Sequence, residues 1–502
     1  MAAATTDSPT RTEPASSTRL FGLTLAAVAA ASLTLPFSVT GTAIALPSMS
    51  AHLGSSIGGT QWIQNAFNLT FASMALASGS LADRFGRRRV LLAGIATFAV
   101  AGLLVALTTS ILLIDIERAV QGAGAAAVLA SGAAVLAHGS EGRRRRLAFS
   151  VLGTAFGAGL ALGPLAAGAL VTAFGWRSPF LATSAVAAVA WICATRVRES
   201  RNPATPPVDI AGLFTFTGGL ACVSLMFVEA TTAGWTSPFT VTVLVAAVGL
   251  LTGFVVVESR DIERAMFDIR LFKRPDFVAI VCQPFAVTLG FVVFLAYLPP
   301  YLQGVTGRSV LESGLLLLPM TVPVLLMPIV GSMIAARTSL RTVLAAASLC
   351  NAAGAFVLLT LHAGTGWLQL AGPLLLTGVG VGLAFGVMDN AAISTVPLEN
   401  AGAAAGIFNT MRLAGEAVAI AGAAAVLTTW TAAHLPAGAS RSTTATAGHA
   451  VQGDIRRADL VPVSQALTSA LHVVAIVLGV TALLGAALSY LALRPANPHP
   501  TD

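Results

Sequence analysis

Charged residues are scarce in this chain of 502 residues, at 10% of the total, whereas 56% of its residues are hydrophobic. Soluble globular domains carry about 25% charged residues, so the composition excludes an ordinary soluble domain. Runs of about 20 apolar residues follow one another, and each is long enough to cross a bilayer. Because hydrocarbon offers no partner for backbone N–H and C=O groups, each run must be helical. The sequence therefore predicts an all-α polytopic membrane protein.

Cysteine is also scarce. The four cysteines, at positions 193, 222, 282 and 350, lie far apart within apolar runs. This spacing gives neither a disulfide framework nor a set of metal ligands. The sequence carries no phosphate loop and no nucleophile motif either. We therefore expect no metal, no cofactor and no catalytic residue.

The apolar runs predict fourteen transmembrane helices, although the third and fourth are separated only by Thr108, Thr109 and Ser110. The expected spans are residues 20–46, 60–81, 90–109, 111–137, 147–174, 179–196, 210–230, 239–257, 278–302, 312–335, 342–361, 366–392, 402–429 and 465–492.

The basic residues predict the orientation of these spans. With the N-terminus inside, 21 of the 28 Lys and Arg residues fall on the cytoplasmic side, five fall outside and two lie within spans. Basic residues are retained in cytoplasmic loops, so this asymmetry favours the assigned span order. We expect a multi-pass protein of the plasma membrane with both termini in the cytoplasm. Its net charge of +7 would face anionic lipid and implies no nucleic-acid binding.

The stretch GSLADRFGRRRV, residues 79–90, concentrates charge between the second and third spans. It resembles the cytoplasmic loop motif of the major facilitator superfamily, G-x-L-a-D-r-x-G-r-r-r. The matching residues are Gly79, Leu81, Asp83, Arg84, Gly86, Arg87, Arg88 and Arg89. Glycines permit close helix approach and a tight turn, and Asp83 can accept hydrogen bonds from an arginine or from a helix N-terminus. The resemblance implies a gate that closes the cytoplasmic side.

Two further motifs resemble the same family. In the fourth span, Arg118, Gln121, Gly122 and Gly124 match a pattern that the family associates with proton transfer. In the fifth span, Gly159, Gly163, Pro164 and Gly168 resemble the motif of its antiporters. Small residues four apart permit close helix packing, and proline favours a bend. The combination implies an exporter that exchanges its substrate for protons.

The resemblance extends over all fourteen spans and indicates the drug:proton antiporter branch of the family, whose two six-helix bundles carry two extra helices between them. The implied organisation is a disordered cytoplasmic tail at 1–19, an N-terminal bundle at 20–200, two additional helices and a linker at 201–276, a C-terminal bundle at 277–495 containing a flexible extracytoplasmic loop at 430–464, and a tail at 496–502.

The first span departs from the family pattern. Ser38 stands where this branch commonly carries an aspartate, and a serine cannot carry a proton near neutral pH. We therefore expect proton coupling to involve Asp115, Glu117 and Arg118 in the fourth span, with Glu416 or Asp389 contributing from the second half. Asp115 and Arg118, three residues apart, could form an ion pair, as could Arg412 and Glu416. The alternative is that both are static pairs that neutralise buried charge.

Polar and aromatic residues within apolar helices are the candidates for substrate contact. They are Trp62, Asn65 and Asn68 in the second span, and Gln283, Tyr297 and Tyr301 in the ninth. Each could equally serve helix packing or the membrane interface.

The sequence thus predicts proton-coupled efflux of amphipathic organic compounds, such as antibiotics, by a monomer in the lipid bilayer. Two alternatives stay open: a facilitator or symporter for a small organic solute, and a receptor-like membrane protein that does not transport.

Overall fold

The computed structural model describes most of the chain. The described residues are 15–54, 57–138, 140, 142–201, 209–260, 269–362, 364–385, 387–388, 391–392, 401–435 and 443–493.

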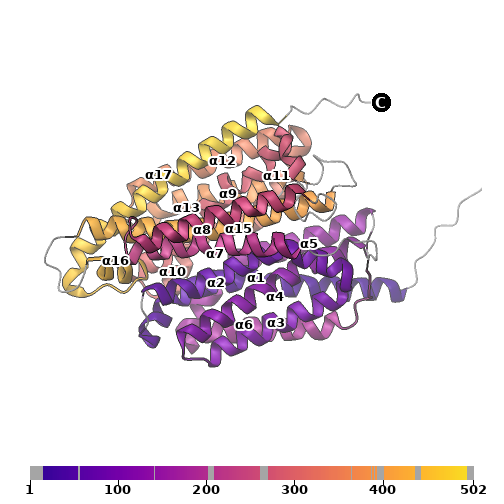
Figure 1. Ribbon diagram of the computed structural model, residues 1–502, viewed down its shortest axis with the longest axis horizontal. Helices are drawn as coiled ribbons and strands as arrows, with labels where there is room; N and C mark the ends of the chain where they lie inside the picture. The colour runs from indigo at the N-terminus through magenta and orange to yellow at the C-terminus, as the bar shows by residue number, and fades with distance from the viewer. Residues whose placement is uncertain are drawn as a thin grey trace, which may run out of the picture.

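Long α-helices make up most of this part of the chain (Figure 1). They are α1 (Ala15–Leu53), α2 (Ile57–Phe85), α3 (Arg87–Leu107), α4 (Ile111–His138), α5 (Gly142–Phe174), α6 (Ser178–Ala194), α7 (Ile210–Thr232), α8 (Pro238–Arg260), α9 (Pro275–Gly304), α10 (Val310–Leu316), α11 (Leu318–Arg337), α12 (Leu340–Val357), α13 (Trp367–Phe385), α15 (Ala401–Ala433), α16 (Thr443–Val451) and α17 (Leu460–Ala492). Short 3₁₀ turns occur at η1 (Ile269–Lys273), η2 (Leu358–Thr360) and η4 (Arg457–Asp459).

The predicted all-α membrane fold is confirmed. Within the described residues, twelve helices are long and apolar enough to cross a membrane. The helix α6 is apolar but shorter, at 17 residues, and α2 is not among the twelve. Every predicted span coincides with at least one helix, while the total of fourteen spans stays a prediction.

Two predicted segments differ in detail from the structure. The span expected at 312–335 is divided into α10 and α11, because Pro319 at the start of α11 lacks the N–H needed to continue α10. The segment 430–464, expected to be a flexible loop, contains α16, which buries Ala447, Ala450 and Val451 against the bundle. The predicted division between the third and fourth spans is confirmed, since α3 ends at Leu107 and α4 begins at Ile111.

The helices form two groups that lie side by side (Figure 1). In the N-terminal group, α1 packs against α5 and α6, and α4 packs against α2 and α3. In the C-terminal group, α13 packs against α11 and α12, and α9 packs against α15 and α17. The two groups meet where α2 contacts α15, where α1 contacts α9, and where α5 contacts α10 and α11. The helix α7 covers the junction of α2 with α15, and α8 packs against α7.

Because successive helices run in opposite directions, the bundle has two ends. The Gly86 end carries the turn between α2 and α3 together with the start of α1 and the end of α17. The Trp176 end carries the turn between α5 and α6, and α16 lies there as well. The centre of the molecule is occupied by α9, whose apolar residues are buried on nearly every side. A helix that is hydrophobic all round is expected in such a central position.

Candidate functional site: a cavity between the two helix groups

A cavity lies where the two helix groups meet, and its empty space of about 650 Å³ includes space open to solvent. Helices α1, α2 and α5 line it from one group, and α9, α13 and α15 line it from the other. Its lining residues are Pro36, Val39, Asn68, Phe71, Phe156, Leu160, Thr288, Phe291, Val292, Leu295, Phe385, Arg412, Leu413, Glu416 and Ile420. The wall is therefore mainly aliphatic and aromatic with a few polar groups, as in pockets for small organic molecules.

Two charged residues of α15 line the cavity. Arg412 and Glu416 are four residues apart on this helix, so they share one face. Arg412 Nη2 donates a hydrogen bond to Asn409 Oδ1 over 2.9 Å, and the guanidinium carbon lies 5.8 Å from the centroid of the Phe385 ring. It also lies 5.9 Å from the ring of Phe156 on α5, which belongs to the other group. The structure thus places a buried cation and a carboxylate at the junction of the two groups.

Arg118 of α4 lies in a separate polar cluster within the N-terminal group. Its side chain is fully buried. The Nε atom donates to the carbonyl oxygen of Ile63 over 3.0 Å, and Nη1 donates to Ser38 Oγ over 2.9 Å and to Gln121 Oε1 over 2.6 Å. The guanidinium carbon lies 4.3 Å from the centroid of the Phe67 ring, a cation–π contact. Ser38, which replaces the usual aspartate, is therefore a direct partner of Arg118.

Neither carboxylate of α4 accepts a hydrogen bond from Arg118 in the described part of the chain. Within the described residues, Asp115 Oδ1 has no hydrogen-bond partner, and no hydrogen bond of Arg118 is made to it. Glu117 accepts a hydrogen bond of 2.7 Å from Thr108 Oγ1, which ties α4 to the turn that precedes it. Asp389, the remaining residue predicted to take part in coupling, lies outside the described residues.

Of the six residues predicted for substrate contact, the cavity lining includes Asn68. Three others make hydrogen bonds that join helices. Gln283 donates to Ser348 Oγ and accepts from Ser489 Oγ, Tyr297 donates to the carbonyl of Ile420, and the Tyr301 hydroxyl bonds Thr468 Oγ1. Trp62 packs against the core of the N-terminal group, and Asn65 is buried in α2.

The small residues of α5 face two different neighbours. A methyl group added at Gly159 would lie 2.2 Å from the carbonyl oxygen of Leu33 in α1, and one at Gly163 would lie 2.0 Å from Thr40 Oγ1. A methyl group at Gly168 would lie 3.1 Å from the carbonyl oxygen of Val310, beside α10. The motif therefore fits α5 closely against α1 on one face and against the C-terminal group on another.

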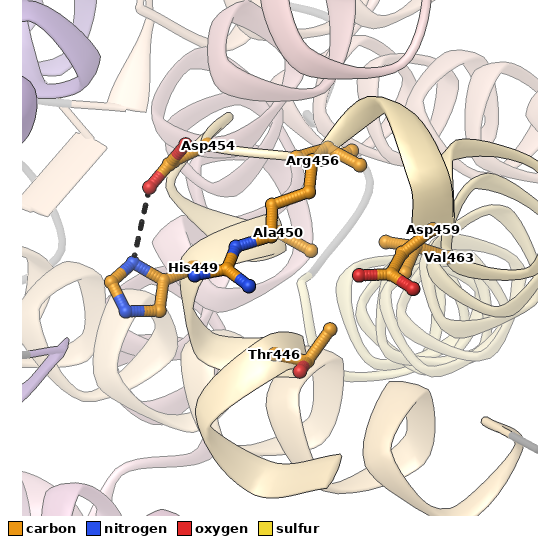
Figure 2. A pocket seen from close by; sticks show the side chains of 8 residues that line it. Thr446, His449, Ala450, Asp454, Arg456, Asp459 and Val463 are labelled. Carbon is orange, nitrogen blue, oxygen red and sulfur yellow. Dashed lines mark ion pairs between the residues drawn. The ribbon is translucent and has the colours of Figure 1, made fainter. Parts of the chain in front are cut away.

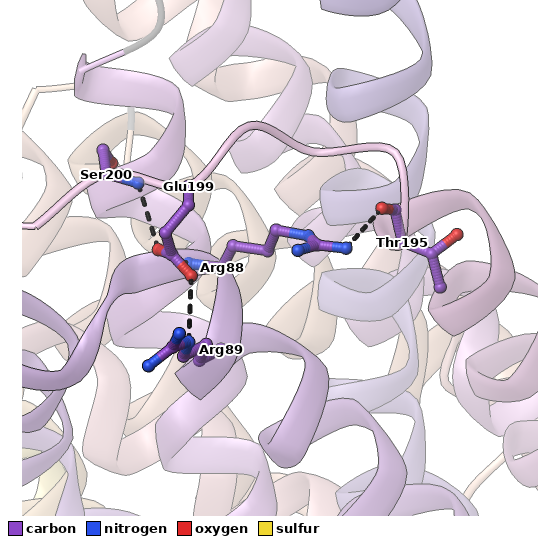
Figure 3. Close-up of polar contacts among 5 residues, drawn as sticks. All are labelled: Arg88, Arg89, Thr195, Glu199 and Ser200. Carbon is purple, nitrogen blue, oxygen red and sulfur yellow. Dashed lines mark hydrogen bonds and ion pairs between the residues drawn. The ribbon is translucent and has the colours of Figure 1, made fainter.

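The loop motif at the Gly86 end forms hydrogen bonds with the segment that follows α6 (Figure 3). Arg88 Nη2 donates to the carbonyl oxygen of Thr195 over 2.7 Å, and its backbone N–H donates to Glu199 Oε1 over 3.1 Å. Gly86 has a φ of +113°, and a methyl group on it would lie 2.7 Å from the Glu199 carboxylate. The backbone conformation requires glycine here, and a side chain would also displace the Glu199 carboxylate.

Glu199 therefore occupies the N-terminus of α3, where the helix dipole favours a carboxylate. It also lies 3.9 Å from Arg89 Nε. Asp83, for which the sequence predicts hydrogen bonds from an arginine or from a helix N-terminus, has its side chain outside the described residues. Glu199 was missed. Its signal in the sequence is a single acid within the basic segment RVRESR that follows the sixth span.

A second polar site lies at the Trp176 end, around the turn that follows α16 (Figure 2). The His449 ring points toward Asp454, with Nδ1 3.3 Å from Oδ2. Gly453, at φ +85°, ends α16 with backbone bonds from Gly453 N to Ala450 O and from Asp454 N to His449 O, the Schellman arrangement. Gly453 also packs directly on Pro300 of α9.

A transporter with two helix groups around a central cavity is the class that this architecture defines. The sequence model of the Major Facilitator Superfamily matches residues 26–420, which is most of the chain. The chain belongs to this superfamily, and the resemblance found in its motifs is confirmed.

Its relatives include resistance proteins and exporters of actinobacteria. The chain is 32% identical to the puromycin resistance protein pur8 of Streptomyces alboniger, over 82% of each chain. It is 29% identical to the multidrug efflux pump LfrA of Mycolicibacterium smegmatis, over 86% of each, and 29% identical to the tetracenomycin C resistance and export protein of Streptomyces glaucescens, over 76% of this chain and 72% of that one.

Solved structures show the same fold. A bacterial homologue of the human lysosomal transporter Spinster superimposes with a TM-score of 0.64 at 15% identity, covering 96% of this chain and 97% of that one. The nucleoside transporter NupG superimposes with a TM-score of 0.59 at 11% identity, covering 94% of this chain and all of that one.

Proposed function

We propose that this protein exports amphipathic organic compounds, such as antibiotics, across the plasma membrane in exchange for protons. The observation that carries the proposal is the cavity between the two helix groups, whose aromatic and aliphatic wall is interrupted by Asn68, Thr288, Arg412 and Glu416. Such a wall suits compounds with a large apolar body and one or two polar groups. The resistance and export roles of the relatives support the same substrate class.

Rocking of the two groups would expose the cavity to each side in turn. At the Trp176 end they are joined by the hydrogen bond between Ser50 Oγ and Gln452 Oε1 and by the close approach of Gly314 in α10 to the carbonyl of Pro164. We place the Gly86 end in the cytoplasm because the basic loops gather there. Substrate would then enter from the cytoplasmic side and leave at the Trp176 end.

Proton coupling is proposed to centre on Glu416, because this carboxylate lines the cavity and lies near Arg412. A bound cationic substrate would favour the ionised carboxylate and so expel its proton. Asp115, Glu117 and Arg118 would contribute in the N-terminal group, and Asp389 is a further candidate. The membrane potential supplies about 2.3 kcal/mol for each elementary charge that crosses 100 mV.

Drug susceptibility tests the proposal. Cells that carry the protein should tolerate higher concentrations of puromycin and of ethidium than cells that lack it. They should also keep ethidium out of the cytoplasm until a proton uncoupler is added. Protection that persists with the uncoupler would contradict proton coupling. The absence of protection against every compound in a broad antibiotic panel would contradict export.

A further inference from the structure

The polar groups of the cavity come from both helix groups, but the two sides are chemically different. The C-terminal group contributes Arg412, which donates to Asn409, and Thr288, which donates to the carbonyl oxygen of Pro284. It also contributes Glu416, one helical turn from Arg412. The N-terminal group contributes only Asn68 among the polar lining residues. On the side of the cavity that the N-terminal group forms, Asn68 is therefore a polar residue in an otherwise apolar wall.

Asn68 is 8% exposed, and its Nδ2 atom has no hydrogen-bond partner in the described part of the chain. Most buried polar atoms in proteins are paired, because leaving a donor unpaired in an apolar environment forfeits the hydrogen bond it had with water. An unpaired buried donor therefore needs a reason. Here the side chain borders the cavity between the two helix groups.

The neighbours of Asn68 indicate what kind of molecule would meet this donor. Phe71 lies three residues further along α2, so it shares the face of Asn68 that borders the cavity. Phe156, Phe291 and Phe385 complete the aromatic part of the lining. Aromatic rings pack well against other flat rings. A flat apolar body held among these rings could direct an acceptor atom at the Asn68 amide.

We propose that Asn68 is a specificity-determining residue, whose amide N–H selects aromatic amphipathic substrates that carry a carbonyl or ether oxygen. This inference rests on the proposed export function and narrows its substrate class. A substrate without such an acceptor would leave the donor unpaired. Sites built to bond a polar group discriminate strongly against analogues that lack it.

Two fluorescent dyes separate this role from general effects on transport. Rhodamine 6G and ethidium are both flat aromatic cations, so both would interact with Glu416. Rhodamine 6G has an ester carbonyl and a ring oxygen, whereas ethidium has neither. The initial export rate of each dye would be measured in cells that produce the full-length protein, with the amount of protein in the membrane determined for every variant.

Replacing the amide by an apolar group of similar size, Asn68→Leu, should lower the ratio of the rhodamine 6G rate to the ethidium rate about fivefold, the value of one neutral hydrogen bond. Asn68→Ser, which keeps an O–H donor, should restore part of the ratio. Gln64→Leu is the matched control, because Gln64 is a buried amide of the same helix that does not line the cavity. It should change both rates by the same factor.

The inference is overturned if Asn68→Leu leaves the ratio unchanged, which would mean that water satisfies the amide without any role in recognition. It is equally overturned if Asn68→Ser behaves like Asn68→Leu, or if the wild type exports ethidium but not rhodamine 6G. A wild type that exports neither dye also contradicts it. The proposed export function fails only if the antibiotic panel shows no protection either.

Discussion

The hydroxyl of Ser50 donates a hydrogen bond of 3.2 Å to Gln452 Oε1, across 402 positions of sequence. Ser50 lies near the end of α1, and Gln452 directly follows α16, so the bond joins the two helix groups at the Trp176 end. Both side chains are buried. The bond can exist only while the two groups are close together at this end.

Removing this bond should weaken the contact between the two helix groups at the Trp176 end. We expect Ser50→Ala to lower the free energy of unfolding by about 1 kcal/mol, because the Gln452 oxygen loses a buried donor. Thermal unfolding of the purified protein would measure the change. The control is Ser332→Ala, since the Ser332 hydroxyl bonds only carbonyls of its own helix on an exposed face. Equal melting temperatures for the two variants would contradict a stabilising role for Ser50.

Arg118 depends on Ser38 in a similar way. In Ser38→Ala, Nη1 of the buried guanidinium keeps only Gln121 as a partner. Hydrogen bonds to charged groups contribute about 1.5–3 kcal/mol, so we expect a loss of about 2 kcal/mol in stability. Ser73→Ala, a change at an equally buried serine of the same helix group whose hydroxyl bonds its own helix, should cost less. A smaller loss for Ser38→Ala than for Ser73→Ala would show that Ser38 does not support Arg118.

The contact between Gly163 and Thr40 predicts a steric effect. Gly163→Ala places a methyl group 2.0 Å from Thr40 Oγ1, so α1 and α5 must separate or Thr40 must move. Overpacking of this kind costs about 1–3 kcal/mol. Gly153→Ala on the same helix meets open space and should leave the melting temperature unchanged or raise it.

A second substitution tests the cause of that loss. Thr40→Ala should restore part of the stability of Gly163→Ala, because it removes the clashing hydroxyl while Thr40 Cβ still lies 3.1 Å away. The double variant would be compared with both single variants by thermal unfolding. Strictly additive losses would contradict a direct contact between the two positions.

The short helix α10 predicts a pH effect at the Trp176 end. The Ser309 backbone N–H and hydroxyl donate to Glu312, whose own N–H donates to Ser309 Oγ, a complete capping box. The hydrogen bond from the Ser309 backbone, then the one from its hydroxyl, hold the pKa of Glu312 below its ordinary value of 4.5. A lowered pKa gives stability that is present above the ordinary value and is lost as the pH falls through the lowered one.

We therefore expect Glu312→Gln to melt at a lower temperature than the wild type at pH 7, with the difference shrinking as the pH falls below about 4. Thermal unfolding between pH 3 and pH 7 would measure it. Because α10 packs against α5 at Pro164, the change should also loosen this contact between the helix groups. A difference that grows toward acidic pH would contradict the capping role.

The sequence predicts the helices well because each span is set locally, by an uninterrupted apolar run or by a break such as Pro319. It predicts side-chain partners less well. Spacing along α4 brings Asp115 and Arg118 to one face, but Arg118 instead bonds Ser38, which is 80 positions away on α1. Periodicity within one helix cannot show a partner on another helix.

The cavity was only partly predictable for the same reason. The helix α9 is apolar on nearly every side, so its pattern does not reveal which face borders the cavity. Gln283 and Tyr301, expected there, bond neighbouring helices, whereas Thr288 and Phe291 line the cavity. Asn68 was predictable because its face of α2 is polar within an apolar helix.

Proton coupling at Glu416 leads to the last prediction. In purified protein at low buffer concentration, binding of the cation ethidium should release protons, since the added positive charge favours the ionised carboxylate. Glu416→Gln keeps the shape of the side chain but cannot lose a proton, so the release should fall to a small fraction of the wild-type value. A pH-sensitive dye would measure the protons, and ethidium fluorescence would measure the amount bound.

Binding and proton release must be compared in the same samples, because a variant that binds less ethidium also releases fewer protons. The relevant quantity is protons released per ethidium bound, and it should drop in Glu416→Gln even at saturating dye. Glu229→Gln is the matched control, since Glu229 lies on α7 and does not line the cavity. It should keep the wild-type ratio. If Glu416→Gln also keeps that ratio, the exchanged proton resides on another group, and Asp115 becomes the next carboxylate to replace.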